Sequence, residues 1–287
     1  MNKNLALLQS QQFSEFFVTI LNDLFAQISQ MSGFDQRYIG NSPVILHICT
    51  AAEVFIYSPG ILELTRAGPG DRLMDIGCGY GFVVGEARRR GMLARGICNC
   101  KQMQRKAAGK HGPYFDLCDY RDIPPDGSYD AITSVEMIEA VTVRYFDVFA
   151  RRVADALKPG GCLVLQAIIA SPWNNPAGRK REVELGSTFV TTHIFPGQQI
   201  PTIDWIHEAF RAAGLSLEFS ETNGRDYAKT LRAWRHNLDR NREGLDPRAV
   251  RTYRYYFAWC EAGFDEELLH STRFVFRKPL LDEEPLS

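Results

Sequence analysis

The spacing of hydrophobic residues changes along the chain, and each change predicts a different structural element. Over residues 5–31, apolar side chains recur every three or four positions, which predicts one amphipathic helix ended by Ser32 and Gly33. The polar face of this helix carries Gln, Ser, Asn and Asp with almost no Lys or Arg. Helices that lie on membranes usually carry cations there. We therefore expect this helix to pack on the core or on a partner subunit.

From residue 72 onward, short apolar runs alternate with longer amphipathic stretches. The short runs predict buried strands and the longer stretches predict helices, and this alternation is typical of a parallel sheet with helices on both faces. The predicted strands are 72–76, 93–98, 129–135, 162–169, 215–219 and 272–278. The predicted helices are 81–90, 101–109, 144–157, 203–213, 226–241 and 247–264.

One segment, residues 171–202, interrupts the alternation with four prolines and three glycines. A long irregular insertion in a compact domain is typically a lid or a binding segment. We therefore divide the chain into an N-terminal helical cap (1–70), a catalytic domain (71–280) that contains the lid at 171–202, and a short tail (281–287).

The overall charge indicates which classes of molecule the chain is suited to bind. The formal net charge is −1, which argues against nucleic acid, since such partners are bound through a basic surface. The chain shows neither a signal peptide nor an apolar run of about 18 residues that could span a membrane. Seven cysteines occur without the spacing of metal ligands, and their number is odd. We expect no metal, no structural disulfide and a reducing cytoplasm.

The strongest chemical signal is the segment LMDIGCGYG at 73–81, where a strand runs into a glycine turn that opens a helix. Glycines let the backbone approach a ligand closely, and the carboxyl edge of a doubly wound sheet is where ligands bind. The turn lacks both the GxGxxG spacing of dinucleotide sites and the GK[ST] of phosphate loops. This pattern favours a cofactor that is held by its amino-acid and ribose ends.

DIGCGYG at 75–81 resembles motif I of class I S-adenosylmethionine (SAM)-dependent methyltransferases, and LKPGG at 157–161 is placed as in that superfamily. More closely, the chain resembles the cyclopropane fatty acid synthase family over residues 72–278. The resemblance implies an α/β fold with a doubly wound, seven-stranded, mostly parallel sheet. Its segments are CDYRDI (118–123), TSVEMIEAV (133–141), HIFPGQQIPT (193–202), DYAKTLRAWRHNL (226–238), YYFAWCEAGF (255–264) and RFVFRK (273–278).

The same resemblance implies a set of cofactor contacts. The glycine turn would line the methionine part of SAM, and Tyr120 and Arg121 match the pair beside adenine. Cys98, Asn99 and Met103 stand where the family has other residues near the ribose, so Gln102 or Gln104 is expected to substitute. The candidate cofactor-binding residues are Asp75, Gly77, Cys78, Gly79, Cys98, Asn99, Gln104, Tyr120, Arg121 and Val135, the last lying under the cofactor.

The catalytic residues implied by the resemblance depart from the family pattern. Family lipid synthases hold bicarbonate as a general base in a cage of a Cys, a Glu, a His, an Ile amide and a Tyr. Glu139, Ile168 and Tyr256 match that cage, Gln166 replaces its His, and its Cys has no equivalent. These departures argue against bicarbonate. Glu139, Tyr256, Gln166 and the loop residue His193 are the candidate catalytic residues, although a helix-capping Glu, a core Tyr and a loop His are the plain alternatives.

The reaction implied is in-line transfer of the SAM methyl group, leaving S-adenosylhomocysteine, with the protein aligning the acceptor and excluding water. The altered cage favours C-methylation of a small molecule such as a specialised metabolite. The alternatives are N-methylation, cyclopropanation of phospholipid acyl chains with peripheral membrane contact, and a SAM-binding pseudoenzyme or cyclase. The oligomeric state stays open, with a homo-oligomer among the alternatives.

Overall fold

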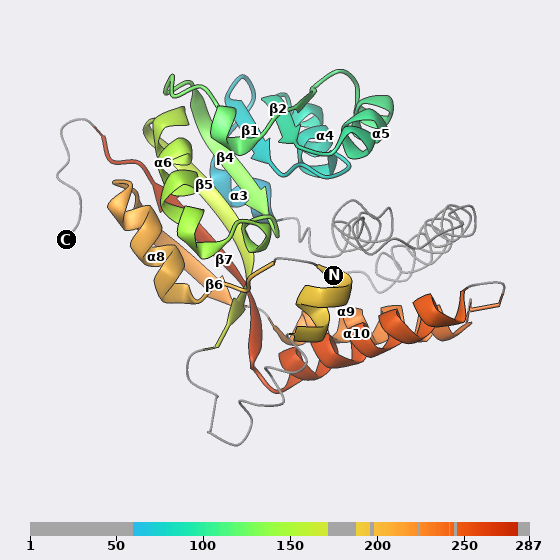
Figure 1. Ribbon diagram of the computed structural model, residues 1–287. Coiled ribbons are helices and arrows are strands. Elements are labelled where there is room, and N and C mark those ends of the chain that lie inside the picture. Colours follow the sequence, from blue (N-terminus) through green and yellow to red (C-terminus); the bar gives the residue numbers. More distant parts are fainter. Residues whose placement is uncertain are drawn as a thin grey trace, which may run out of the picture.

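The computed structural model describes residues 60–171, 188–195, 198–222, 224–240, 242–243 and 246–280. They build a seven-stranded sheet in the order β3-β2-β1-β4-β5-β7-β6 (Figure 1). The first five strands are parallel, and β7 runs antiparallel to both β5 and β6. The strands are β1 (Arg72–Ile76), β2 (Leu93–Cys98), β3 (Phe115–Leu117), β4 (Tyr129–Val135), β5 (Leu157–Ala170), β6 (Ser216–Thr222) and β7 (Leu269–Arg277).

Helices connect these strands and cover the sheet. The α-helices are α3 (Gly60–Thr65), α4 (Phe82–Arg89), α5 (Lys101–His111), α6 (Phe146–Ala156), α8 (Ile203–Ala212), α9 (Arg225–Arg240) and α10 (Pro247–Asp265). Short helical turns occur at η2 (Tyr120–Asp122), η3 (Ile138–Ala140), η4 (Val143–Tyr145) and η5 (Val190–Ile194). The helix predicted at 5–31 and the tail at 281–287 lie outside the described residues.

Two cores cover the two faces of the sheet, because successive strand residues point to opposite faces. Met74 and Ile132 pack into the core beneath α6 and α8. Their neighbours Leu73 and Ala131 pack into the core beneath α3, α4 and α5. This arrangement confirms the predicted doubly wound fold with helices on both faces.

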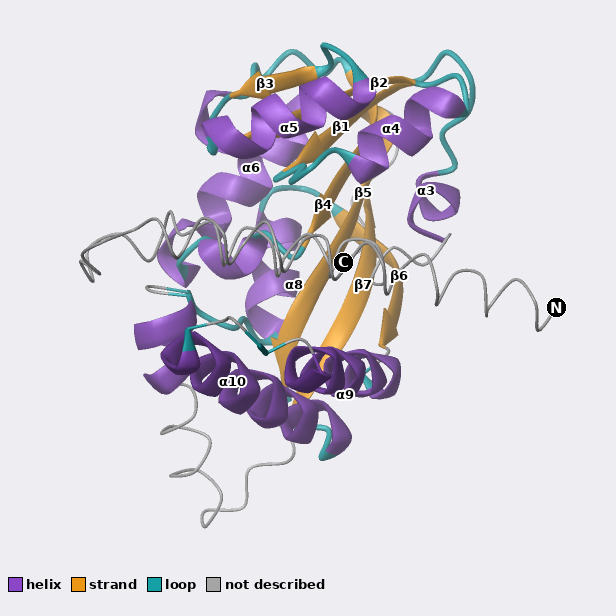
Figure 2. Cartoon of the chain, turned by 90° about the vertical axis from the view of Figure 1, so that its right-hand side faces the viewer, coloured by secondary structure: helices purple, strands orange, loops and turns teal. Residues whose placement is uncertain are grey.

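The C-terminal helices form a third packing unit. α9 and α10 lie side by side beyond the end of the sheet (Figures 1 and 2). Their shared core contains Leu231, Trp234 and Phe257, and it also takes in Val190 and Ile194 of η5. A part of the segment predicted as a lid is therefore helical and packs on this pair.

The structure differs from the sequence-based prediction at β3 and β5. β3 was not predicted because it has three residues, of which only the first is buried. β5 begins at Leu157, five residues before the predicted start, and includes Gly160 and Gly161, which lie between the predicted helix 144–157 and the predicted strand 162–169. The amide of Gly160 donates to Lys278 O and the amide of Lys278 donates to Gly161 O, each at 2.9 Å. Pairing with the chain after β7 thus keeps this segment extended.

Two helix-interior glycines allow the packing of α4 on α5 to be tested. A Cβ added to Gly85 would lie 2.8 Å from Cε1 of His111, whereas one added to Gly109 would meet nothing within 4 Å. We expect Gly109→Ala to raise the free energy of unfolding by about 0.5–1 kcal/mol, since alanine favours the helix. We expect Gly85→Ala to lower it by about 1–3 kcal/mol through overpacking. Urea denaturation measures both, and equal stabilisation by the two variants would contradict the packing.

Candidate active site

The candidate site lies where the strand order reverses direction. β1 and β4 are parallel neighbours, with Leu73 opposite Ala131 and Asp75 opposite Thr133. From β1 the chain continues outward to β2 and β3, whereas β5 lies on the other side of β4. Ligands of doubly wound sheets bind at the carboxyl ends of the strands at such a switch point. The turn at 77–81 follows β1 there, and the segment 136–140 follows β4.

The glycine turn owes its shape to close packing as well as to backbone conformation. Gly77, Gly79 and Gly81 have φ angles of 78°, 52° and 81°, in the left-handed region that favours glycine. A Cβ on Gly77 would overlap Met137, and one on Gly81 would overlap the ring of Phe115. The turn is therefore held directly against the segment that follows β4.

Asp75, the acid of motif I, lies beneath the turn. It is 2% exposed, and Oγ1 of Thr133 donates to its Oδ1 at 2.7 Å. Burial raises the pKa of Asp75 to about 7. This hydrogen bond ties the end of β1 to β4, so the structure gives Asp75 a role in holding the switch point together.

The residues predicted near the ribose lie at and after the end of β2. Cys98 is buried there beside Cys78, and a hydrogen bond from the Cys78 thiol lowers the pKa of Cys98 to about 7. Asn99 is exposed. Nε2 of Gln104 donates to Phe115 O at 2.9 Å, so this amide is already used inside the protein. Asn99 is thus the more accessible of the polar candidates.

The residues predicted beside adenine and under the cofactor lie along the same edge. Tyr120 on η2 packs edge-on against Phe149, with ring centroids 5.3 Å apart. The exposed Arg121 donates from Nε to Oδ1 of Asp119 at 2.8 Å. Val135 ends β4 and is half-buried. The predicted contacts of these residues with a cofactor stay predictions.

Glu139 is a buried carboxyl on η3. The side chain is 5% exposed, and its Oε1 accepts a hydrogen bond from the Ile168 amide at 2.6 Å. Its Oε2 is buried, and no hydrogen-bond donor faces it among the residues that the structure describes. Burial, followed by the charge of Glu136, raises the pKa of Glu139 to about 8.

A second acid, Glu136, lies beside Glu139 and was not among the candidates predicted from the sequence. Its Oε2 accepts from the Tyr227 hydroxyl at 2.9 Å, and its Oε1 accepts from Nε2 of Gln166 at 3.2 Å. Burial raises the pKa of Glu136 to about 7, although these two hydrogen bonds oppose the shift. The segment TSVEMIEAV contains both acids, but only the fold shows that both belong to one site.

Comparison with known protein families identifies the chain. The family model described as mycolic acid cyclopropane synthetase matches residues 59–274. The chain belongs to this family. The match confirms the resemblance that the sequence motifs predict.

Relatives and solved structures agree with this membership. Tuberculostearic acid methyltransferase of Mycobacterium tuberculosis is 31% identical over 238 residues, which cover 78% of this chain and 53% of that protein. A probable fatty acid methyltransferase of Pseudomonas putida is 29% identical over 230 residues, covering 76% and 57%. The chain thus spans about half the length of these relatives. A mycolic acid cyclopropane synthase crystallised with SAH and CTAB has a TM-score of 0.72 at 20% identity, covering 79% of this chain and 85% of that one, which confirms the fold.

Some of the residues that the cyclopropane synthase family implies for the anion cage form hydrogen bonds with each other or with Glu136. Glu139 and Ile168 share a hydrogen bond, and Gln166 lies within hydrogen-bonding distance of Glu136. Tyr256 on α10 packs edge-on against Phe195, with ring centroids 5.9 Å apart. Tyr256 and Glu139 are both candidates implied by the family resemblance, and a shared catalytic role for them stays a prediction.

His193, the fourth candidate catalytic residue, makes its ring contact with a residue other than the two acids. It lies exposed on η5, with its ring 5.2 Å from that of Phe189. Within the described ranges, no hydrogen bond links His193 to either acid. Its predicted role as a proton acceptor has no support in these contacts and stays untested.

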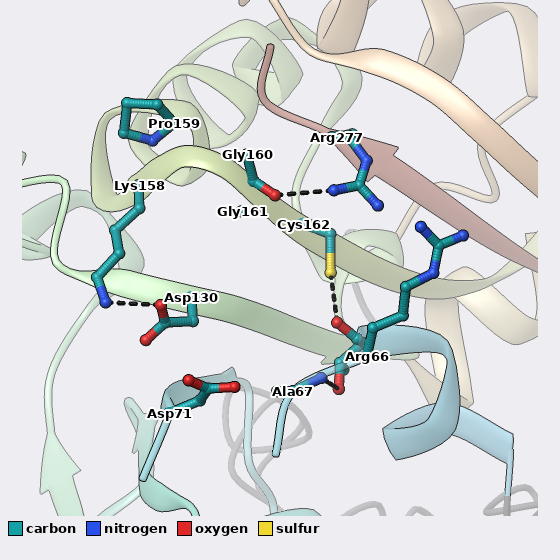
Figure 3. A pocket seen from close by; sticks show the side chains of 11 residues that line it. Arg66, Ala67, Asp71, Asp130, Lys158, Pro159, Gly160, Gly161, Cys162 and Arg277 are labelled. Atoms are coloured by element: carbon teal, nitrogen blue, oxygen red, sulfur yellow. Dashed lines mark hydrogen bonds and ion pairs between the residues drawn. The ribbon is translucent and has the colours of Figure 1, made fainter. Parts of the chain in front are cut away.

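A separate hollow lies at the opposite edge of the sheet, around the start of β5 (Figure 3). There Nζ of Lys158 donates to Asp130 at 2.6 Å, and Nη1 of Arg277 donates to Gly160 O at 2.9 Å. These cations already have partners, and the hollow faces away from the glycine turn. We therefore assign the candidate site to the carboxyl edge of the strands.

The sequence also predicts that the chain has no metal site, no structural disulfide and no membrane-spanning segment. None of the six cysteines of the described ranges is joined in a disulfide there, and no three His, Cys, Asp or Glu side chains in those ranges are grouped to hold a metal ion. The predicted lack of a metal and of a disulfide stays a prediction for the whole chain. Among the described helices, none combines the length and apolar character needed to cross a membrane.

The buried carboxyl of Glu139 predicts a pH-dependent stability. Its pKa rises from 4.5 to about 8 on folding, so the folded chain binds more protons than the unfolded chain between these values. Stability contributed by this group is therefore lost as the pH rises through that window. We expect Glu139→Gln to become more stable than the unaltered chain by about 1–3 kcal/mol as the pH is raised from about 5 to 8.

Chemical denaturation of the ligand-free protein at several pH values measures this difference. Glu208→Gln, which changes an exposed carboxyl on α8, is the matched control and is expected to follow the unaltered chain. Parallel stability curves for Glu139→Gln and the unaltered chain would contradict the assignment of a buried, proton-binding carboxyl.

Proposed function

We infer that this chain is a SAM-dependent methyltransferase that transfers a methyl group to an alkene carbon of a lipid-type substrate. The observation that carries this inference is the pair of acids, Glu136 and Glu139, held directly beside the glycine turn at the switch point of the sheet. Such an arrangement, in a member of the cyclopropane synthetase family, supports methyl transfer followed by removal of a proton.

The residues at the carboxyl edge fit a cofactor of this kind. The glycines of the turn at 77–81 let a ligand approach the backbone closely, Tyr120 offers an aromatic ring for a base, and Val135 offers an apolar surface. SAM supplies a methyl group on a sulfonium, which needs no further activation. The protein's contribution is then to align the acceptor carbon, to exclude water and to accept the proton that is released.

Apolar side chains around the C-terminal helices favour a lipid over the specialised small molecule that the altered cage suggested. Ile168, Phe189, Phe195 and Tyr256 are partly buried and border the core that α9 and α10 share. An acyl chain is recognised by such apolar surface rather than by hydrogen bonds. The names of the curated relatives, a tuberculostearic acid and a fatty acid methyltransferase, point the same way.

SAM binding is tested by a pair of glycine-to-arginine variants. Gly79 adopts a φ of 52° in the turn, and an arginine there would fill the space proposed for the cofactor. Gly109→Arg places the same side chain in open space on α5. By calorimetry we expect Gly79→Arg to lose SAM binding and Gly109→Arg to retain it, with thermal melts verifying that both variants fold. Unchanged affinity in Gly79→Arg would overturn the cofactor site.

The acceptor is tested with methyl-labelled SAM and vesicles of dioleoyl phosphatidylethanolamine and phosphatidylglycerol. We expect label in the acyl chains, detected by mass spectrometry after hydrolysis of the lipids. Label found instead in small molecules of a metabolite extract would favour the specialised-metabolite alternative. SAM binding without any transfer would favour a pseudoenzyme.

A further inference from the structure

We propose that the carboxylate of Glu136, held by Tyr227 and Gln166, is a built-in base that takes the proton released after methyl transfer, in place of a bound anion. This inference rests on the proposed function and deepens it, because it assigns the proton acceptor of that same site.

The hydrogen bonds around Glu136 come from three different elements. The Tyr227 hydroxyl on α9 donates to one carboxyl oxygen at 2.9 Å, and Nε2 of Gln166 on β5 donates to the other at 3.2 Å. Nε of Arg273 on β7 donates to Oε1 of Gln166 at 3.0 Å. Since an arginine can only donate, it fixes the side-chain amide of Gln166 so that the NH₂ group faces Glu136.

The backbone of Glu136 is held in an uncommon conformation. Its φ is 49°, in the left-handed region that non-glycine residues rarely adopt. The Glu136 amide donates to Gln166 O at 2.8 Å, so both the main chain and the side chain of Glu136 are bound to β5. Strained residues of this kind cluster at functional sites, where the surrounding structure maintains them.

Glu139 supplies an independent reason to place the chemistry here. Its Oε2 is buried and faces no donor among the described residues. Its Oε1 accepts the hydrogen bond of the Ile168 amide. Glu136 has two donors and Glu139 has one, which favours the charge on Glu136 and the proton on Glu139 when the two share one proton. The Ile168 amide, which the family cage would offer to an anion, is taken by Glu139.

A bound bicarbonate would be repelled at this position. A carboxylate at Glu136 already carries one negative charge, and the attraction or repulsion between close charges is strong where water is excluded. The donors that would hold an anion, Gln166 and the Ile168 amide, are instead engaged with Glu136 and Glu139. The protein thus supplies from its own sequence the charge that an anion would bring.

The proposed step balances in atoms and charge. An alkene carbon of the substrate displaces the thioether, so the S–CH₃ bond breaks, a C–CH₃ bond forms, and the positive charge moves from sulfur to the neighbouring carbon. Glu136 then takes a proton from the new methyl group or from an adjacent carbon. The electrons of that C–H bond close a ring or form a double bond, and the protonated Glu136 later releases the proton to solvent.

The base is tested by removal and chemical rescue in the vesicle assay, using buffers freed of carbon dioxide. Glycine at position 136 suits the left-handed backbone, so Glu136→Gly removes the carboxylate without adding strain. We expect the unaltered chain to keep its turnover without bicarbonate. We expect Glu136→Gly to lose about 10²-fold or more in turnover, to keep its SAM affinity, and to regain activity when formate or bicarbonate is added.

The positioning residue Tyr227 gives a second readout. Tyr227→Phe removes a donor that favours the ionised form of Glu136, so the acid limb of the pH–rate profile should move to higher pH. A merely structural role would lower the whole profile without moving that limb. The other titratable or charged groups around Glu136 and Tyr227 are Glu139 on η3, Arg273 on β7, and Tyr256 and Cys260 on α10.

Three results would overturn the assignment. The first is bicarbonate-dependent turnover by the unaltered chain, and the second is full turnover by Glu136→Gly in buffer freed of carbon dioxide. The third is a loss in Glu136→Gly that no small carboxylate restores, although its SAM affinity and thermal melt are unchanged. No methyl transfer by the unaltered chain would overturn the proposed function itself, and the base assignment with it.

Discussion

The parallel pairing of β1 with β4 is the constraint on which the candidate site depends. It places the turn after β1 against the segment after β4 so tightly that Gly77 has no room for a side chain beside Met137. The Asp75–Thr133 hydrogen bond fixes this pairing at its last residue pair, close to the carboxyl ends of the two strands. Because the turn and the acids are attached to neighbouring strands, their relative position follows from the sheet and not from flexible loops. A methyl donor seated in the turn would therefore be delivered beside Glu136 by the architecture alone.

Burying acids at that position costs stability, since a carboxylate loses its hydration on burial. The protein limits the cost in different ways for the three acids near the candidate site. Asp75 accepts from a hydroxyl, Glu136 accepts from a phenol and an amide, and Glu139 retains an unpartnered oxygen with a pKa of about 8. A protonated Glu139 carries no charge, so it can occupy an apolar position beside an ionised neighbour. The site is thus a place where local stability is lower than a purely apolar core would give, as is common at functional sites.

The sequence predicts the central strands better than the periphery. β1, β2 and β4 lie at their predicted bounds. β1 and β4 are mostly buried on both faces, whereas β2 exposes Leu93 and Arg95 and is buried over its last three residues. β3 is too short to give a recognisable apolar pattern in the sequence. The start of β5 depends on pairing with residue 278, which is distant in sequence. In the candidate site, too, the sequence predicts some residues from local motifs, whereas others are recognised only from long-range contacts. Glu139 and Ile168 were found through family motifs, whereas Glu136 is recognised only through Tyr227, a partner 91 residues away.

Residue 166 is a glutamine where the family cage has a histidine. A histidine there could bind a proton and so compete with a neighbouring carboxyl for it near neutral pH. Glutamine carries no charge at any pH, yet it both accepts from Arg273 and donates to Glu136. It therefore passes the orienting influence of the partly buried Arg273 to the carboxylate without taking part in proton exchange. In this chain the departures from the family cage are mutually consistent. A carboxylate from the segment after β4 takes the place of an anion, a phenol from α9 holds it, and a neutral amide replaces the group that would otherwise share its proton.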